Sequence, residues 1–357
     1  MKQFLLILSM AFTVKADAQD STVTPLSISG YAEVYYVKDF NHPLNHTRPG
    51  FLYSYNRSGE MTLNLGYIKA AYVTQQVRAN LSLAAGTYMN ANLAAEPGVF
   101  RNIYEANAGI RLSRNSNLWL DAGIFGSHIG FESAIGKDCW NLTRSLLAEN
   151  SPYYEAGARL SYTSTDNHWY LAALVLNGWQ RIHRIENNTT PAFGTQVTYK
   201  PNARITLNSS TFIGNDKPDS TRQMRYFHNL YGIFQLSNTV GVTAGLDAGM
   251  EQKAKGSSRM NYWYSPVLIV KINTSSKTAL ALRGEYYADQ NGVIIATGTP
   301  NGFRTWGWSA NFDVAVATNA TWRVEARTLS SKDAIFSKDN TAVSSNTFLS
   351  TAIAISF

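Results

Sequence analysis

The sequence consists mostly of short runs in which apolar and polar residues alternate, separated by turn-forming residues. In VGVTAGLDAGME, which begins at Val240, every second side chain is apolar, and the positions between include Asp247 and Glu251. A period of two is the signature of a β-strand whose two faces meet different surroundings. The connections between the runs are alternately short and long, as expected when antiparallel neighbours are joined in chain order.

This alternation predicts an all-β, up-and-down fold of about sixteen strands. The strands are expected to begin near Ser27, Glu60, Val77, Tyr104, Asn117, Tyr153, His168, Ala192, Ala203, Met224, Val240, Met260, Lys277, Thr305, Ala320 and Asn346. An even number of strands returns both chain ends to the side of the short turns. About sixteen strands closed into a barrel leave a lumen wide enough to hold water.

One strand indicates most clearly that the inner face is wet. In TWRVEARTL, residues 321–329, Arg323, Glu325 and Arg327 share one face and apolar side chains occupy the other. Unpaired charge in a dry core is costly, so a soluble β-sandwich is disfavoured. Only 15% of the residues are charged and 12% are aromatic, and no apolar run has the ~20 residues of a membrane-spanning helix. The chain is therefore predicted to be a transmembrane antiparallel β-barrel with short periplasmic turns and long extracellular loops.

Both ends of the chain carry targeting patterns. Residues 1–18 are predicted to be a signal peptide, because Lys2 precedes an apolar run and Ala16-Asp17-Ala18 provides a small-x-small cleavage site. A buried N-terminal helix is the alternative. Residues 19–357 are then one barrel domain in the outer membrane of a Gram-negative cell. The last strand ends in Phe357 with apolar residues at every second position, which resembles the signal that outer-membrane barrels present to their assembly machinery.

The longest connection, residues 131–152, interrupts the alternation. Loops of this length inside a compact fold are usually functional, so we expect this third external loop to fold into the lumen and narrow it. Residues 138–149 are expected to form a short helix within it. The candidates for the constriction are Glu132, Lys137, Asp138, Arg144 and Glu149. A loop that only plugs or caps the barrel is the alternative.

Charged residues also recur on the predicted inner faces of the strands. The candidates for the lumen wall are Arg78, Arg111, Arg159, Arg323, Glu325 and Arg327. Opposite the acidic residues of the loop, they would create a transverse field that filters solutes by size and charge. In a simpler interpretation such charges pair along the wall, as Arg283 with Glu285 or Glu155 with Arg159 could. Lys69 falls on the predicted lipid face and is expected near a membrane boundary.

Three stretches carry a resemblance to a known family: SGYAEVYYVKDFN, RPGFLYSYNRSGEMTLNLGYIKAAY and DAGIFGSHIGFESAIGKDCWNLTRSLLAENSPYYEAGARLSY. They resemble the OmpL-like β-barrel porin family of Bacteroidota-type bacteria. The resemblance covers most of the chain after the signal and is densest up to about residue 180. It implies an outer-membrane barrel with a porin role and offers no catalytic residues.

Enzymatic and metal-binding interpretations find little support. Ser127 and His128 are adjacent, but neighbours on a strand point to opposite faces, which prevents a Ser–His hydrogen bond. His42 and His46 are four residues apart in a proline-containing loop rather than on a helix. Cys139 is the only cysteine, so no intrachain disulfide can form. We expect no enzyme activity, no cofactor and no metal site.

The function expected from these patterns is passive diffusion of small hydrophilic solutes. A channel selective for anions or oligosaccharides, and a closed barrel that serves as an anchor or adhesin, remain open alternatives. An oligosaccharide channel would need lumen-facing aromatic residues in a line, which the alternation does not show. The net charge of +7 is scattered without a basic run, so nucleic acid is not expected as a partner. The expected partners are membrane lipids, the barrel-assembly machinery, small solutes and further copies of the chain.

Overall fold

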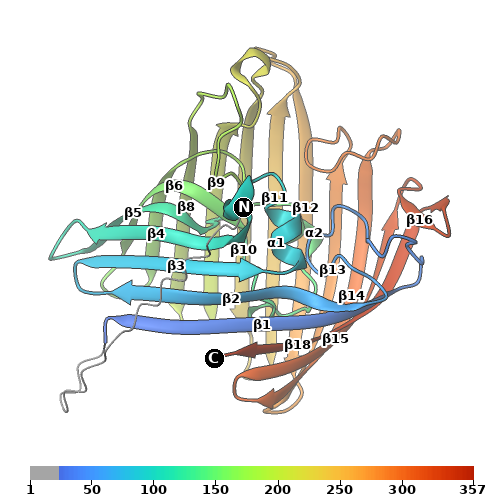
Figure 1. The fold of residues 1–357 in the computed structure, drawn as a ribbon, viewed down its shortest axis with the longest axis horizontal. Coiled ribbons are helices and arrows are strands. Elements are labelled where there is room, and N and C mark those ends of the chain that lie inside the picture. Colours follow the sequence, from blue (N-terminus) through green and yellow to red (C-terminus); the bar gives the residue numbers. More distant parts are fainter. Residues whose placement is uncertain (1–23) are drawn as a thin grey trace, which may run out of the picture.

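The computed structural model describes residues 24–357, in which sixteen strands close into one antiparallel barrel (Figure 1). Consecutive barrel strands are hydrogen-bonded neighbours, and β1 pairs with β18 to close the ring. At this seam Gly30 and Phe357 exchange backbone hydrogen bonds of 2.7 and 3.0 Å. The expected signal peptide, residues 1–18, lies outside the described part of the chain.

The barrel strands are β1 (Leu26–Asp39), β2 (Met61–Val73), β3 (Val77–Ala85), β4 (Ile103–Arg111), β5 (Asn117–Gly126), β6 (Tyr154–Thr163), β7 (Trp169–Leu176), β8 (Ala192–Asn202), β9 (Ile205–Asn215), β10 (Met224–Gln235), β11 (Val240–Gln252), β12 (Met260–Asn273), β13 (Thr278–Asp289), β14 (Phe303–Ala317), β15 (Ala320–Ser331) and β18 (Ser345–Ser356). The helical segments are α1 (Thr87–Asn92), α2 (Leu146–Glu149) and the short 3-10 turns η1 (Gly98–Asn102), η2 (Gly136–Asp138) and η3 (Asp219–Thr221).

The strand prediction is confirmed. Every strand of the barrel begins within two residues of its predicted start. The long connections all lie at one end and are numbered here in chain order. The first to eighth loops are residues 40–60, 86–102, 127–153, 177–191, 216–223, 253–259, 290–302 and 332–344. The eighth loop also contains an unpredicted hairpin of β16 (Phe336–Lys338) and β17 (Thr341–Val343).

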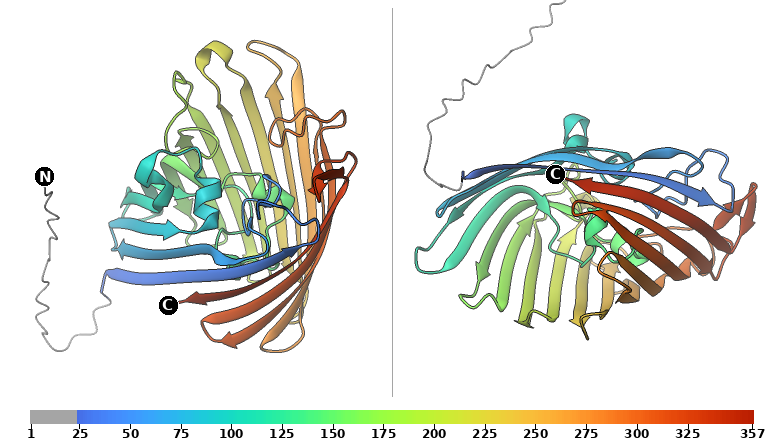
Figure 2. Two further views of the ribbon diagram at one scale, coloured as in Figure 1. Left: turned by 45° about the vertical axis from the view of Figure 1, so that its right-hand side comes forward. Right: turned by 90° about the horizontal axis from the view of Figure 1, so that it is seen from below.

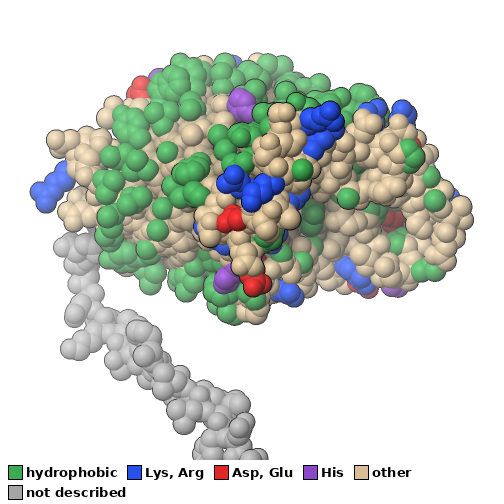
Figure 3. All heavy atoms as spheres, turned by 90° about the horizontal axis from the view of Figure 1, so that it is seen from above, with side chains coloured by type: hydrophobic (Ala, Val, Ile, Leu, Met, Phe, Trp, Pro, Cys, Tyr) green, Lys and Arg blue, Asp and Glu red, His purple; other side chains and the backbone are tan. Residues whose placement is uncertain are grey.

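The two faces of the wall have the predicted character. Outward side chains such as Leu268, Leu282 and Trp308 are exposed, whereas inward Glu325 and Arg323 are buried. Hydrophobic side chains therefore cover much of the outer surface, and Lys and Arg gather in patches between them (Figure 3). None of the helices within residues 24–357 is long and apolar enough to cross a membrane. The outer face suits lipid, and the inner face is reserved for polar groups.

The predicted orientation of Lys69 is wrong. Lys69 pairs in register with Ser82, which is fully buried on the inner face, and its Nζ lies 2.5 Å from the Glu105 carboxylate. The cause lies in β2 itself, where a register shift between Glu33 and Val34 of β1 leaves Asn64 as an extra residue and reverses the faces that follow it. A second shift, between Ser82 and Leu83, inserts an extra residue into β4 and turns the Tyr104 ring inward. A local bulge of this kind changes which face a side chain occupies, and no periodicity in one strand reveals it.

The third loop does not extend away from the barrel. In Figure 2 the segment between β5 and β6 runs inside the ring of strands. Residues 141–150 are all buried. The predicted helix over 138–149 is largely wrong, because only α2 at its end and η2 at its beginning are helical. The backbone between them is irregular, with bends between an extended Cys139 and an extended Ser145, which leaves its N–H and C=O groups free to bond with the wall.

Candidate functional site

The third loop is fixed to the wall where it enters the lumen. His128 Nδ1 lies 2.9 Å from both oxygens of Glu155, and its Nε2 lies 2.8 Å from the carbonyl oxygen of Thr211 on β9. Burial alone would lower the pKa of His128, but the Glu155 carboxylate raises it above the ordinary value. Both ring nitrogens can therefore donate as a cation. The ring passes over Gly194, where an added Cβ would lie 2.6 Å from Nε2.

The loop then follows β10 and β11 across the lumen. Asn229 Oδ1 accepts a hydrogen bond of 3.2 Å from the backbone N–H of Gly130. The rings of Phe131 and Trp140 lie over glycines of β11, where added Cβ atoms would come within 2.7 and 2.8 Å of them. Glycine makes room here for close approach of the loop to the sheet.

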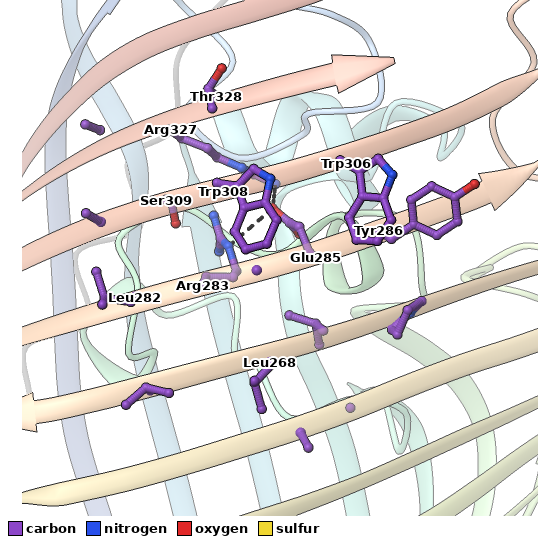
Figure 4. A pocket seen from close by; sticks show the side chains of 18 of the residues that line it. Leu268, Leu282, Arg283, Glu285, Tyr286, Trp306, Trp308, Ser309, Arg327 and Thr328 are labelled. Atoms are coloured by element: carbon purple, nitrogen blue, oxygen red, sulfur yellow. Dashed lines mark hydrogen bonds and ion pairs between the residues drawn. The ribbon is translucent and has the colours of Figure 1, made fainter. Parts of the chain in front are cut away.

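Five buried charges on β13 and β15, here called the clamp, hold the far end of the loop: Arg283, Glu285, Arg323, Glu325 and Arg327. The charged groups of Arg283, Glu285 and Arg327 point toward one another across the intervening strand β14 (Figure 4), with Arg327–Glu285 at 2.6 Å and Arg283–Glu285 at 3.3 Å. Arg283 also lies 3.0 Å from Glu325. On the outer face of this wall, Trp306 and Trp308 of β14 are exposed. The clamp is thus a buried ion-pair network facing inward.

The clamp binds mainly the backbone of the loop, and it also bonds the Thr143 hydroxyl, which accepts from Arg283 at 3.0 Å and from Arg327 at 3.2 Å. Glu325 accepts from the N–H of Thr143 at 2.5 Å, and Glu285 accepts from the N–H of Leu146 at 2.5 Å. The three arginines donate at 2.6–2.9 Å to the carbonyl oxygens of Gly136, Cys139, Thr143 and Arg144. Charged partners roughly double the strength of such hydrogen bonds.

Two of the predicted constriction residues stabilise the loop from within. Arg144 donates to the carbonyl oxygens of Ser133, Leu142 and Ala134, at 2.6, 2.7 and 3.1 Å. Glu132 accepts from both the N–H and the hydroxyl of Ser145. Burial raises the pKa of the Glu132 carboxyl. Neither charged group reaches the open lumen. The two side chains therefore do not lie across the lumen from the wall arginines, as the sequence had predicted.

Glu149 connects the third loop to the first. Its Oε2 accepts hydrogen bonds from the backbone N–H groups of Tyr53 and Ser54, at 2.9 and 3.1 Å. Burial raises the pKa of this carboxyl to about 7. The contact therefore contains a carboxyl group that changes charge near neutral pH.

Lys137 and Asp138 are the predicted constriction residues that remain exposed. They occupy the η2 turn, where Lys137 Nζ reaches 2.7 Å from Ser356 Oγ on β18, the strand next to β15. Because β18 ends at Ser356, this turn lies toward the short-turn end of the barrel. The loop thus presents one exposed charge of each sign at its deepest point.

The predicted wall residues divide into two groups. Arg323, Glu325 and Arg327 belong to the clamp. Arg78 lies 2.5 Å from Asp121 and Arg159 lies 3.6 Å from the same carboxylate, so Arg159 does not take Glu155 as partner. Arg111 donates to the carbonyl oxygen of Ser116 at 3.2 Å, beside a short turn. The wall of β2–β6 therefore keeps partly exposed charges, in contrast to the wall under the loop.

Aromatic residues do line up on the inner face, contrary to the expectation from alternation. The rings of Tyr31 and Tyr67 stack with centroids 5.7 Å apart, and those of Tyr67 and Tyr104 stack at 5.5 Å. Tyr104 joins the row only because of the bulge in β4. Because the three rings stack on one another, their faces are covered, and a solute in the lumen would meet mainly the edges of the rings.

The arrangement around Ser127 and His128 is structural. Both side chains bond to Glu155 instead of to each other, and His128 Nε2 is occupied by a backbone carbonyl. Cys139 is buried and its thiol contacts the carbonyl oxygen of Ser133. No group of three His, Cys, Asp or Glu residues that could hold a metal ion occurs in the region 24–357.

Sequence reasoning missed a cavity of about 420 Å³ at the long-loop end, here called the vestibule. Six loops and the ends of two strands surround it, and α2 of the third loop contributes Glu149 to its lining. Its lining includes Tyr53, Trp179, Arg181, Asp216 and Arg225. These residues come from three loops and strand β10, so no local pattern could have grouped them.

Phe357 lies on the outer surface with 74% of its side chain exposed. Its ring lies over Gly30, where an added Cβ would come within 2.4 Å of it. The terminal residue is therefore both the end of the closing strand and an accessible aromatic group.

The match to known families covers nearly all of the described chain. Residues 25–357 match the model of the family described as "Putative beta-barrel porin-2, OmpL-like". The chain belongs to this family. It is an outer-membrane porin channel, and its sequence matches no curated protein significantly.

Solved structures show that the porin has the general porin fold. An anion-selective porin from Comamonas acidovorans superimposes with a TM-score of 0.61 at 9% identity, covering 93% of this chain and 99% of that one. The outer membrane channel DcaP of Acinetobacter baumannii gives 0.61 at 9% identity over 93% and 97%. The trimer form of OmpT from Vibrio cholerae gives 0.58 at 8% identity over 93% and 99%.

Proposed function

We propose that this porin lets small hydrophilic solutes diffuse passively through a lumen that its third loop narrows. The observation that carries the proposal is the fixed path of residues 127–153 inside the barrel. The clamp holds the loop against β13–β15, and partly exposed polar residues line the opposite wall. Ala134 and Ile135 of the loop pack against Leu65 and Ile124 of that wall, so water and solutes would pass nearest to β2–β6 toward the short-turn end, where Lys69, Arg78 and Arg159 stay partly exposed.

The narrow passage carries more positive than negative charge, which supports a preference for anions. Its basic groups are Lys69, Arg78, Arg111, Lys137 and Arg159, and its acidic groups are Glu105, Asp121 and Asp138. Rings of fixed charge bias which ions enter a pore. The role of Glu132, Arg144 and Glu149 would be to hold the loop in position rather than to contact solutes.

Single-channel recording across a planar bilayer tests this function. We expect stable conductance steps and an anion-selective reversal potential in a salt gradient. A double change of Lys137→Gln and Asp138→Asn should alter conductance, because these side chains form the exposed tip of the loop. A folded barrel without conductance would overturn the channel mechanism and favour a closed anchor.

Assembly and association are further parts of the proposal. An accessible terminal Phe357 supports recognition by the barrel-assembly machinery, and the trimer form of the similar OmpT structure supports association of several barrels. Removing Phe357 should lower the amount of assembled protein in cells while leaving refolding in detergent intact. Equal losses in both would show that Phe357 acts on stability instead.

A further inference from the structure

The vestibule is built as a binding site rather than as a plain entrance. Its volume of about 420 Å³ lies within the usual range for small-ligand pockets. Trp179 forms part of one side, and Asn92, Asn150 and Gln180 provide amides around it. A wide aqueous mouth would not require six loops to converge on so small a space.

Most charged groups at the vestibule are already satisfied by protein partners. Arg225 lies 2.7 Å from Glu251 and 3.2 Å from Asp216. Asp216 also accepts from the backbone N–H of Trp179 at 2.9 Å. Glu149 is engaged by the first loop, as described above. These charges therefore have little capacity left for a solute.

Arg181 is the exception. This partly buried guanidinium lines the vestibule and makes no hydrogen bond or ion pair with any residue in the described range 24–357. Asp216 is the nearby acid, but it lies beyond ion-pair distance and already bonds Arg225. A buried Nε with no acceptor is unfavourable, and a planar guanidinium pairs best with a carboxylate that accepts two parallel hydrogen bonds.

Neutral hydrogen-bonding groups complete the site. The Tyr53 hydroxyl has no partner within residues 24–357, and the side-chain oxygens of Asn92 and Asn150 accept no hydrogen bond there either. These free groups can bond with ligand hydroxyls. An apolar wall from Val293 and Ile294 limits the width of the cavity.

We propose that the vestibule binds a small hydroxylated carboxylate, of the size and chemistry of a sugar acid, with Arg181 taking the carboxylate. This names the solute class for the entrance of the proposed pore. Occupancy would raise the local concentration of such anions directly above the third loop. The site is separate from the clamp, whose arginines are buried against the loop and the carboxylates of the wall.

Calorimetric titration of the refolded protein in detergent with D-glucuronate tests the site. D-glucose serves as the matched neutral probe, because it lacks the carboxylate. We expect glucuronate to bind at least tenfold more tightly than glucose, and Arg181→Gln to weaken glucuronate binding roughly tenfold or more. Equal affinities for the two sugars, or an unchanged affinity in Arg181→Gln, would overturn the proposal.

Arg184→Gln is the control variant. It removes the same charge from the same loop, but Arg184 does not line the cavity and donates to the carbonyl oxygens of Thr189 and Thr190. Its affinity for glucuronate should stay within about twofold of the native value. If Arg181→Gln fails to fold, Arg181→Lys keeps the charge without the planar fork and should still weaken binding.

Current recording separates this inference from the proposed channel function. Glucuronate added on the long-loop side should produce brief current blockades in the native porin and not in Arg181→Gln. Binding in detergent without any conductance would overturn the channel and leave the site standing. Conductance with no glucuronate binding would overturn the site and leave the channel standing.

Discussion

Two walls of the same barrel carry the same kinds of residue and use them differently. On β13 and β15 the side chains of Arg283, Glu285 and Glu325 are 0% exposed and bind the third loop. On the wall opposite, the side chains of Lys69 and Arg78 are each 28% exposed and pair with neighbours across the sheet. An inward charge in this porin is therefore a structural clamp or a lumen group, depending on whether the loop covers it.

This difference indicates why the permeation path follows one side of the lumen. A buried ion-pair network is strongly disrupted when one partner is lost, because an uncompensated charge remains in a dry site. An exposed pair contributes only ~0–1 kcal/mol. The clamp thus fixes the loop to one side, and the lumen that remains is bordered by the weaker pairs.

The largest expected effect separates the two walls directly. Glu325→Gln should detach the loop from the clamp, because the variant loses the charge that binds Arg283 and the Thr143 N–H. The buried Cys139 thiol reports detachment, and burial raises its pKa to about 11, which slows its reaction further. A loss of ~3 kcal/mol at the clamp would speed maleimide labelling on the order of 100-fold.

Glu105→Gln is the matched change on the opposite wall, where the Glu105 side chain is 18% exposed and pairs with Lys69. Labelling of Cys139 should stay within about twofold of the native rate, since an exposed pair contributes little. Equal acceleration by both variants would remove the distinction between clamp and lumen wall.

A smaller effect, on the order of tenfold, is expected from pH at the contact between the first and third loops. Burial raises the pKa of Glu149 from 4.5 to about 7, so the packed contact binds the proton more tightly than the open one. Its stability is therefore greatest below pH 4.5 and falls as the pH rises through 7. Intrinsic-rate-corrected hydrogen exchange of residues 51–56 should show more protection at pH 5 than at pH 8. Glu149→Gln should abolish that difference, and a difference that persists would assign it to another group.

A several-fold increase in Cys139 labelling is expected for Gly194→Ala. The new methyl would lie 2.6 Å from His128 Nε2, and the ring cannot move without losing its bonds to Glu155 and Thr211. Gly126→Ala is the control, because no atom lies within 4 Å of its added Cβ. A normal labelling rate in Gly194→Ala would show that the entrance of the loop tolerates displacement.

The smallest expected effect concerns the exposed wall. Arg78→Gln should lower the permeability of chloride relative to potassium by about twofold, because one positive charge leaves the water-lined side. Arg304→Gln, a change of the same type at an exposed residue bonded to Gln290, should leave the reversal potential unchanged. A shift of equal size in both would mean that overall charge, not the wall of β2–β6, sets selectivity.

The strands could be predicted from the sequence because each one alternates between side chains that face lipid and side chains that face the inside of the barrel. Local alternation alone was enough to predict that Arg323 faces inward and that Trp322, Val324 and Ala326 face outward. The site could not be predicted in the same way. The bond between Thr143 and Glu325 joins positions 182 residues apart, and Lys69 changes its expected face through the geometry of the strand. Arg181 stands out only once the partners of every neighbouring charge are known.

The clamp makes most of its contacts to the loop with backbone atoms, and this has a consequence for how the pore can diversify. Arg323 bonds the carbonyl oxygens of Gly136 and Cys139, whereas the side chains of Lys137 and Asp138 between them are exposed. Substitutions at the tip can therefore change the charge of the filter without moving the scaffold that positions it. Natural drift or directed evolution could retune such a channel one residue at a time, with the barrel acting as a constant frame.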